Sequence, residues 1–263
     1  MRPARLLAAL LLTLSLALPA MAGGPGRDTL YQVSLLDALL DGDYYGSLSV
    51  GELLGHGDTG LGTFQDLDGE MVVSGGVVYQ IDMQGVPHAM PPQTMTPFAQ
   101  VTFFDPDLTL RPPAGLDFPG LKKWLTAQLP SPNLFYAVRV KGRFEKIKAR
   151  SVPKQKPPYP PLLQVVKNGQ AVFDWQAVDG ELVGFISPAF AKGTGAPGWH
   201  LHFLSADKTK GGHLLATTLG QVTVEVDLTN ELTIVLPTKG PFLKMDLASD
   251  RSKALHLVEQ GKK

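Results

Sequence analysis

Apolar and polar positions alternate along most of the second half of the chain, which is the pattern of half-buried β-strands. The stretch "NLFYAVRVKGRFEKIKARSV" alternates around Gly142, and this favours a β-hairpin that turns at the glycine. Further strands are predicted in "AVFDWQAV", "ELVGFISPAF", "GWHLHFLS", "HLLATTLGQVTVEVDL" and "ELTIVLP". The second half is therefore predicted to be mostly β-structure.

The pattern in the first half of the chain predicts further strands and a few helices. Residues 61–83 hold β-branched and aromatic runs separated by Asp-Gly and Gly-Gly, which is typical of successive hairpins. Another strand is predicted at residues 98–104. Ser49 precedes Glu52 by three positions, a capping-box pattern that predicts a short helix. Apolar residues at helical spacing predict a second helix over residues 120–129.

These patterns predict a β-rich α+β protein of two lobes, with mixed and antiparallel sheets and few short helices. The proline-rich stretch "KQKPPYPPLL" is expected to be an extended connector and a seam between lobes. An N-terminal α+β lobe is then predicted at residues 23–153 and a β-rich C-terminal lobe at 154–263. The length of 263 residues fits one large domain or two small, closely packed ones.

The beginning of the chain is expected to be a secretory signal peptide, residues 1–22. Arg2 and Arg5 precede a mainly apolar segment at residues 6–18, and "AMA" then forms a small-residue cleavage site. The apolar segment is shorter than the roughly 20 residues that span a bilayer. We therefore expect export to the periplasm or the medium, and no membrane association after cleavage.

The amino-acid composition limits which binding partners and which metal ligands can be expected. The chain has 24 basic and 24 acidic residues, so its charge gives no reason to expect nucleic acid or an anionic membrane as a partner. It has no cysteine, so an exported form cannot be stabilised by disulfides. Any tight transition-metal site must therefore use histidine and carboxylate ligands.

The stretch "GWHLHFLSADKTKGGHLL" holds three of the six histidines. In a strand, His200 and His202 point to the same side about 6.5 Å apart. His213 follows a glycine turn and can begin the return strand. Three imidazoles leave a coordination position open, as in catalytic zinc sites. The alternative is that these histidines occupy the polar face of an amphipathic strand. The other histidines, His56, His88 and His256, are expected at the surface or in loops.

Several blocks of the sequence resemble the acetolactate decarboxylase family. They are "GHGDTGLGTFQDLDGEM", "FAQVTFF", "RSVPKQKPPYPPL", "GELVGFISPAF" and "GWHLHFLSADKTKGGH", in the family's order. The similarity extends from about Leu30 to the last few residues. It implies a homodimeric zinc enzyme that converts 2-acetolactate to acetoin and carbon dioxide. In such an enzyme the metal polarises the ketone and hydroxyl oxygens of the substrate.

The resemblance also implies roles for individual residues. The three metal ligands fall on His200, His202 and His213. Glu70 in "LDGE", Arg150 in "RSVP" and Glu259 near the C-terminus correspond to catalytic residues that position the substrate and deliver the proton. Arg150 and Thr63 are also expected to bind the substrate.

From the residues alone, Arg150 is a solvated charge at a strand end and Glu70 an ordinary turn carboxylate. Two other functions stay open. One is an exported metal-binding or ligand-binding β-protein that kept the fold without catalysis. The other is a zinc hydrolase on a different β-scaffold, although the chain lacks the H-E-x-x-H pattern.

Overall fold

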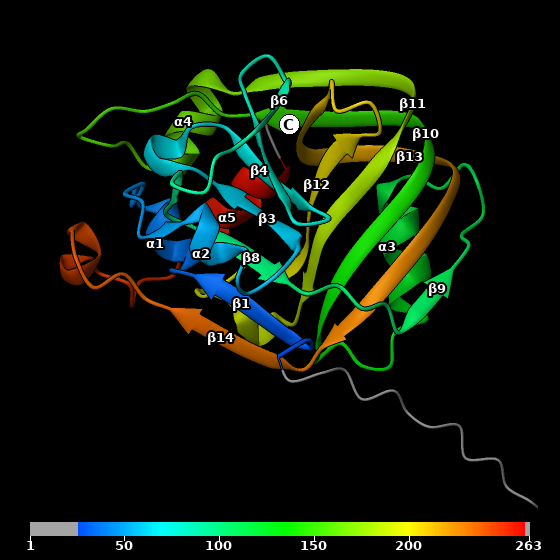
Figure 1. Ribbon diagram of the computed structural model, residues 1–263, viewed down its shortest axis with the longest axis horizontal. Helices are drawn as coiled ribbons and strands as arrows, with labels where there is room; N and C mark the ends of the chain where they lie inside the picture. Colours follow the sequence, from blue (N-terminus) through cyan, green and yellow to red (C-terminus); the bar gives the residue numbers. More distant parts are fainter. Residues whose placement is uncertain (1–25, 261–263) are drawn as a thin grey trace, which may run out of the picture.

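Two β-sheets that pack against each other carry most of the regular structure (Figure 1). The computed structural model describes residues 26–260. One sheet is mixed, because its edge strand β14 runs parallel to β1 while the other neighbours are antiparallel. In spatial order its strands are β14 (Glu231–Val235), β1 (Thr29–Val33), β8 (Ala99–Thr102), β3 (Thr59–Thr63), β4 (Glu70–Ser74), β5 (Val77–Ile81) and β6 (Pro87–Ala89).

The second sheet is antiparallel and closes on itself. Its strands are β10 (Phe135–Ser151), β11 (Ala171–Ser187), β12 (Gly198–Ser205), β13 (Gly211–Thr229) and β9 (Leu108–Leu110). Strand β10 pairs with β11 along one edge and with β13 along the other, so four long strands form a ring. A small separate ladder joins β2 (Leu48–Ser49) to β7 (Met95–Thr96).

The helices are few and short, as predicted. They are α1 (Leu36–Leu40), α2 (Val50–Leu53), α3 (Phe118–Thr126), α4 (Leu162–Gly169) and α5 (Ser252–Gln260), with 3-10 turns at Gln65–Leu67, Ala189–Ala191 and Pro241–Lys244. Helix α2 begins with the predicted capping box, in which Ser49 and Glu52 satisfy each other's backbone N–H groups. Helix α3 overlaps the predicted helix 120–129 at residues 120–126 and buries Leu121 and Leu125 against the ring of strands. Helices α4 and α5 were not predicted from the sequence.

The predicted hairpin at Gly142 is wrong. Strand β10 runs through this residue as one continuous strand, and the register slips just after it. A side chain on Gly142 would place its Cβ 2.3 Å from the carbonyl oxygen of Gln221, so only glycine allows β13 to approach this closely. The alternating pattern identified the strand correctly, but the glycine serves close approach between strands and not a turn.

The fold class is confirmed as β-rich, with mixed and antiparallel sheets and few helices. The proline-rich residues 154–161 form the expected irregular connector between β10 and α4. The division into lobes at residues 23–153 and 154–263 stays a prediction. The predicted signal peptide, residues 1–22, lies outside the described residues. Between residues 26 and 260, no helix is long and apolar enough to cross a bilayer.

Candidate metal centre and active site

The three predicted metal-binding histidines come together where the two sheets meet. His200 and His202 share one face of β12, and His213 lies directly opposite His202 at the start of β13. All three are buried, and a set of ligand nitrogens, one from each, lies within 4.8 Å of one another. Alternation along β12 and pairing with β13 thus direct three imidazoles toward one point.

Burial keeps these imidazoles neutral. It lowers the pKa of His200 to about 3 and the pKa of His202 and His213 well below the usual value; the nearby Arg150 guanidinium lowers all three further. A neutral imidazole retains a lone pair, which metal coordination requires. His202 also has a fixed tautomer, because its Nδ1–H donates to the carbonyl oxygen of Met71 at 2.7 Å. Its Nε2 therefore carries the lone pair that can bind a metal, and this nitrogen lies 3.3 Å from Nδ1 of His213.

The surroundings of His200 also fit a metal. Its Nδ1 is buried and has no hydrogen-bond partner among residues 26–260. A buried imidazole nitrogen without a partner is costly unless something binds it. Three neutral imidazoles beside carboxylates form a donor set that suits a divalent transition metal with one open position. The residues present therefore fit the metal that the sequence resemblance implies.

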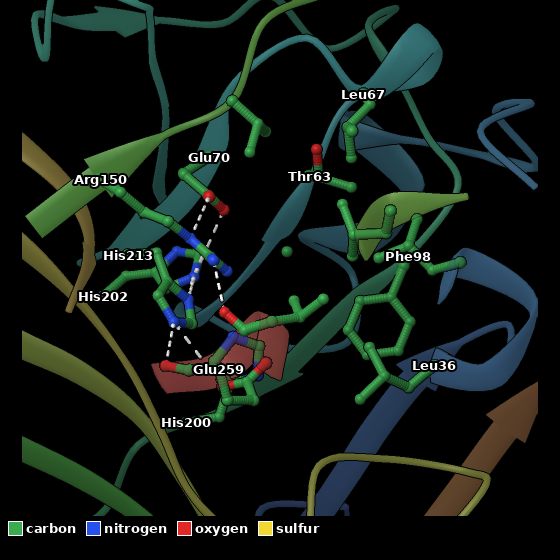
Figure 2. Close-up of a pocket in the computed structure, with 15 residues that line it drawn as sticks. Leu36, Thr63, Leu67, Glu70, Phe98, Arg150, His200, His202, His213 and Glu259 are labelled. Carbon is green, nitrogen blue, oxygen red and sulfur yellow. Dashed lines mark hydrogen bonds and ion pairs between the residues drawn. The ribbon is translucent and has the colours of Figure 1, made fainter. Parts of the chain in front are cut away.

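Glu70 and Arg150 lie beside the histidines. Glu70 begins β4, and its Oε2 atom is 3.6 Å from Nε2 of His202, while Oε1 is 3.8 Å from Nε of Arg150 (Figure 2). Burial raises the pKa of Glu70 to about 7, with a further rise from Glu259 and an opposing effect of Arg150. Near neutral pH, Glu70 can therefore either hold or release a proton.

Arg150, near the end of β10, is not the solvated charge that its local sequence indicates. Its side chain is only 3% exposed, and Nη1 donates to the carbonyl oxygen of Val258. Burial lowers its pKa from the usual value, although Glu70 and Glu259 oppose this. Its Nε has no hydrogen-bond partner in the described part of the chain. A cation with a free, buried N–H is well placed to bind a small carboxylate.

Glu259 reaches the same pocket from helix α5. Its Oε2 atom lies 3.7 Å from Nε2 of His213, and its backbone oxygen is 3.4 Å from the same nitrogen. Burial raises the pKa of this carboxyl to about 7, against the opposing effects of Arg150 and Lys122. The pocket therefore holds two carboxyl groups, Glu70 and Glu259, that both titrate near neutral pH.

Thr63 also lines the pocket, at the end of β3 directly opposite Glu70. Its hydroxyl donates to the carbonyl oxygen of Gly69 at 2.7 Å and is buried. In this arrangement the hydroxyl proton is already used, and the bond holds the turn that carries Glu70. Thr63 therefore stabilises the turn before Glu70 as well as lining the pocket.

An apolar wall faces the polar groups, and the sequence did not reveal it. Figure 2 shows Leu36, Leu67 and Phe98 across the cavity from the histidines. Other apolar members are Leu39, Val152, Leu162 and Val258. The pocket leaves about 40 Å³ open to the centres of water-sized molecules. That is room for roughly three waters, which is the scale of a site for a small molecule.

Comparison with known proteins identifies the family. The family model for alpha-acetolactate decarboxylase matches residues 30–249. The alpha-acetolactate decarboxylase of Methylococcus capsulatus is 41% identical and is aligned over 87% of this chain and 88% of its own. That of Methanosarcina mazei is 42% identical, over 89% and 81%.

Solved structures agree with this result. The crystal structure of alpha-acetolactate decarboxylase from Bacillus subtilis strain 168 superimposes with a TM-score of 0.86 at 35% identity. The superposition covers 89% of this chain and all of that one. The resemblance seen in the sequence is confirmed. The chain belongs to the alpha-acetolactate decarboxylase family.

Proposed function

We propose that this protein decarboxylates 2-acetolactate to acetoin and carbon dioxide, using a zinc ion held by His200, His202 and His213. One observation carries the proposal. In a chain of this family, three neutral buried imidazoles converge in the same small pocket as Glu70, Arg150 and Glu259. When bound, the ion supplies a Lewis acid that stabilises negative charge on the substrate oxygens.

Arg150 is proposed to bind the substrate carboxylate. The substrate is an anion, and the buried guanidinium has a free Nε–H in the pocket. Glu70 lies 3.8 Å from that nitrogen, and its carboxylate opposes the lowering of the Arg150 pKa by burial. Because Val258 fixes Nη1, the guanidinium plane has a defined orientation.

The reaction then needs one proton. The bond between the carboxylate carbon and C2 breaks, carbon dioxide leaves, and the electron pair moves toward the neighbouring ketone oxygen to give an enediolate. A proton added at C2 completes acetoin. Glu70 and Glu259, with pKa values of about 7, can each hold that proton at neutral pH. Arg150 is a weaker acid, so positioning is its favoured role.

The apolar wall supports the same reaction. Leu36, Leu67 and Phe98 offer contacts for the two methyl groups of the substrate and limit the water around it. In a site with little water, the interaction of Arg150 with an anionic substrate is stronger than in solution.

We also propose that the protein acts as an exported homodimer. The sequence of residues 1–22 supports export. Strand β14 is an edge strand of the seven-stranded sheet and exposes Leu232 and Val235, and Leu236 directly after it is exposed as well. An apolar sheet edge is a ready surface for pairing with a second copy. Analytical ultracentrifugation of the purified protein tests the dimer, and fractionation of cells tests export.

Acetoin production tests the proposed activity. Purified protein is incubated with racemic acetolactate, with and without a chelator, and acetoin and bound metal are measured. We expect acetoin well above the spontaneous rate, and loss of activity on metal removal. Acetoin at the spontaneous rate only would refute the proposal, and acetolactate binding without turnover would favour a binding protein. Activity after complete metal removal would refute the metal role.

His202→Ala tests the ligands, with His88→Ala as the matched control. We expect His202→Ala to lose both metal and activity, because it removes one of the three converging imidazoles, the one whose Nδ1 is held by the carbonyl oxygen of Met71. His88 is exposed and pairs with Asp82, so its removal should change neither quantity. Stoichiometric metal in folded His202→Ala would contradict the ligand set.

A further inference from the structure

Helix α5 separates the active-site pocket from a larger groove. Val258 and Glu259 line the pocket, while Leu255, His256 and Glu259 border a groove of about 900 Å³ between α3, β12 and β13. Glu259 therefore lies in both walls, as Figure 2 shows for the pocket side. Helix α5 therefore forms part of the wall between the pocket and the groove.

The end of α5 contacts the site, but the helix has little to hold it there. Val258 accepts a hydrogen bond from Arg150, and Glu259 faces His213. Of the side chains described in α5, only Leu255 and Val258 are buried. A helix of nine residues is not stable by itself, so its position depends on tertiary contacts.

Arg251, just before α5, provides a strong contact of this kind. Its Nη2 donates to Asp41 and to the carbonyl oxygen of Asp246, and its Nη1 donates to the carbonyl oxygen of Ser249 at 2.8 Å. Asp37 lies 4.0 Å from Nη1. The side chains of Arg251 and Asp37 are each 11% exposed and that of Asp41 is 37% exposed, so the Asp37 contact is shielded from water and the Asp41 ion pair only partly.

The partners of Arg251 connect α5 to the opposite wall of the pocket. Asp37 belongs to α1 and Asp41 caps it, and the same helix supplies Leu36 and Leu39 to the apolar wall. The carbonyl oxygen of Arg251 also accepts the first hydrogen bond of α5, from Leu255 N at 2.9 Å. Arg251 thus joins the start of α5 to a helix that forms part of the pocket.

We propose that Arg251 is a positioning residue that docks α5 on α1 and thereby holds Glu259 and the Val258 carbonyl in the active site. Glu259 lies two helical turns beyond Arg251, about 12 Å along the axis. Loss of the Arg251 side chain therefore removes no group from the pocket, but it allows the end of α5 to move. The effect on catalysis rests on the proposed function, whereas the docking of α5 does not.

A double-mutant cycle separates positioning from general stability. We expect Arg251→Ala to lower kcat about tenfold in the wild-type background and to have a much smaller effect in Glu259→Gln, where only the contact of Arg150 with the Val258 carbonyl remains to be disturbed. The effects of residues that act through each other are not additive. Arg251→Lys, which keeps the charge but not the fork of donors, should restore part of kcat. Arg143→Ala, which removes an exposed ion pair with Asp179, is the matched control and should change nothing.

Hydrogen exchange gives a readout that does not depend on activity. Amides of residues 252–260 should exchange at least tenfold faster in Arg251→Ala, with β10 and β13 unchanged. If Arg251→Ala does not fold, Asp41→Asn removes the same ion pair from α1 and should give the same local increase.

The two measurements also distinguish the two proposals. Wild-type protein without activity refutes the proposed function, and exchange in α5 then still tests the docking. Unchanged exchange in α5, or equal kcat effects of Arg251→Ala with and without Glu259, would overturn the positioning role.

Discussion

Glu70 and Arg150 are ion-paired without a direct hydrogen bond. The Oε1 atom of Glu70 lies 3.8 Å from Nε of Arg150, and that nitrogen has no hydrogen-bond partner among the described residues. The distance is too long for a hydrogen bond, which leaves the N–H available, and short enough for the two groups to attract each other electrostatically. A carboxylate ligand can therefore bind Arg150 without displacing Glu70.

Replacing the carboxyl group of Glu70 by an amide tests its part in proton delivery. We expect Glu70→Gln to lower kcat by about 10²- to 10⁴-fold, since an amide cannot transfer the proton. Bound metal should be retained, because three histidines remain. Steady-state kinetics and metal analysis measure both quantities, and Glu145→Gln on the exposed face of β10 is the control. A kcat within threefold of wild type would contradict the role.

Replacing Arg150 by lysine tests the importance of the several N–H donors of its planar guanidinium group. Lysine keeps the charge, but one ammonium cannot reproduce the planar contacts to Val258 O and a carboxylate. We expect kcat/KM to fall about 10- to 100-fold, the equivalent of one charged hydrogen bond. Arg139→Lys, at an ion pair with Glu225 away from the pocket, should be near wild type. Equal kcat/KM in Arg150→Lys would argue against substrate binding by the guanidinium.

Gly212 is predicted to be irreplaceable beside His213. Its φ is +147°, and a Cβ would lie 2.5 Å from the carbonyl oxygen of Arg150. Gly212→Ala should therefore destabilise the fold by about 3 kcal/mol and weaken metal binding, because β13 must move away from β10. Thermal unfolding and metal titration measure these effects. Gly75→Ala, with positive φ but open space, should cost less and leave the metal bound.

The buried carboxyl group of Asp227 should make the free energy of unfolding depend on pH. It is completely buried on β13, and burial raises its pKa to about 7, partly offset by a hydrogen bond from Asp105 N. In the unfolded chain an aspartate titrates near 3.9. Between about pH 4 and 7 the folded state therefore binds more protons, so this group lowers stability as pH rises, and the loss is complete above pH 7.

The variant Asp227→Asn should remove that loss. We expect it to be more stable than wild type at pH 8, by up to about 4 kcal/mol, and to differ little at pH 4. Denaturant unfolding at the two pH values measures the difference. The same gain at both pH values would show that titration of Asp227 is not its cause.

Local patterns predicted the parts of the fold that depend on neighbours in the sequence. Ser49 and Glu52 are three residues apart, so their capping box could be read directly. Alternation placed His200 and His202 on one face. Gly142 was misinterpreted, because a glycine needed for close strand approach and one needed for a turn have the same sequence signal.

The site depends more on distant contacts, which local patterns cannot provide. Glu70 and Arg150 came from the family resemblance alone, since nothing local distinguishes them from surface charges. The acceptors for His202 and Arg150 are backbone carbonyls of Met71 and Val258, and every residue has such a group. The structure also brings Glu259 into the pocket, through a helix with too little apolar surface to be predicted.

The hydrogen bonds that hold the site join residues far apart in the chain: His202 and Met71 are separated by 131 positions, and Arg150 and Val258 by 108. Forming contacts of this kind requires the closure of long loops, which costs conformational entropy. The three tryptophans, Trp124, Trp175 and Trp199, all pack against the core of the ring of strands. Their fluorescence therefore follows the formation of that ring, whereas catalytic activity appears only when both sheets and α5 have docked.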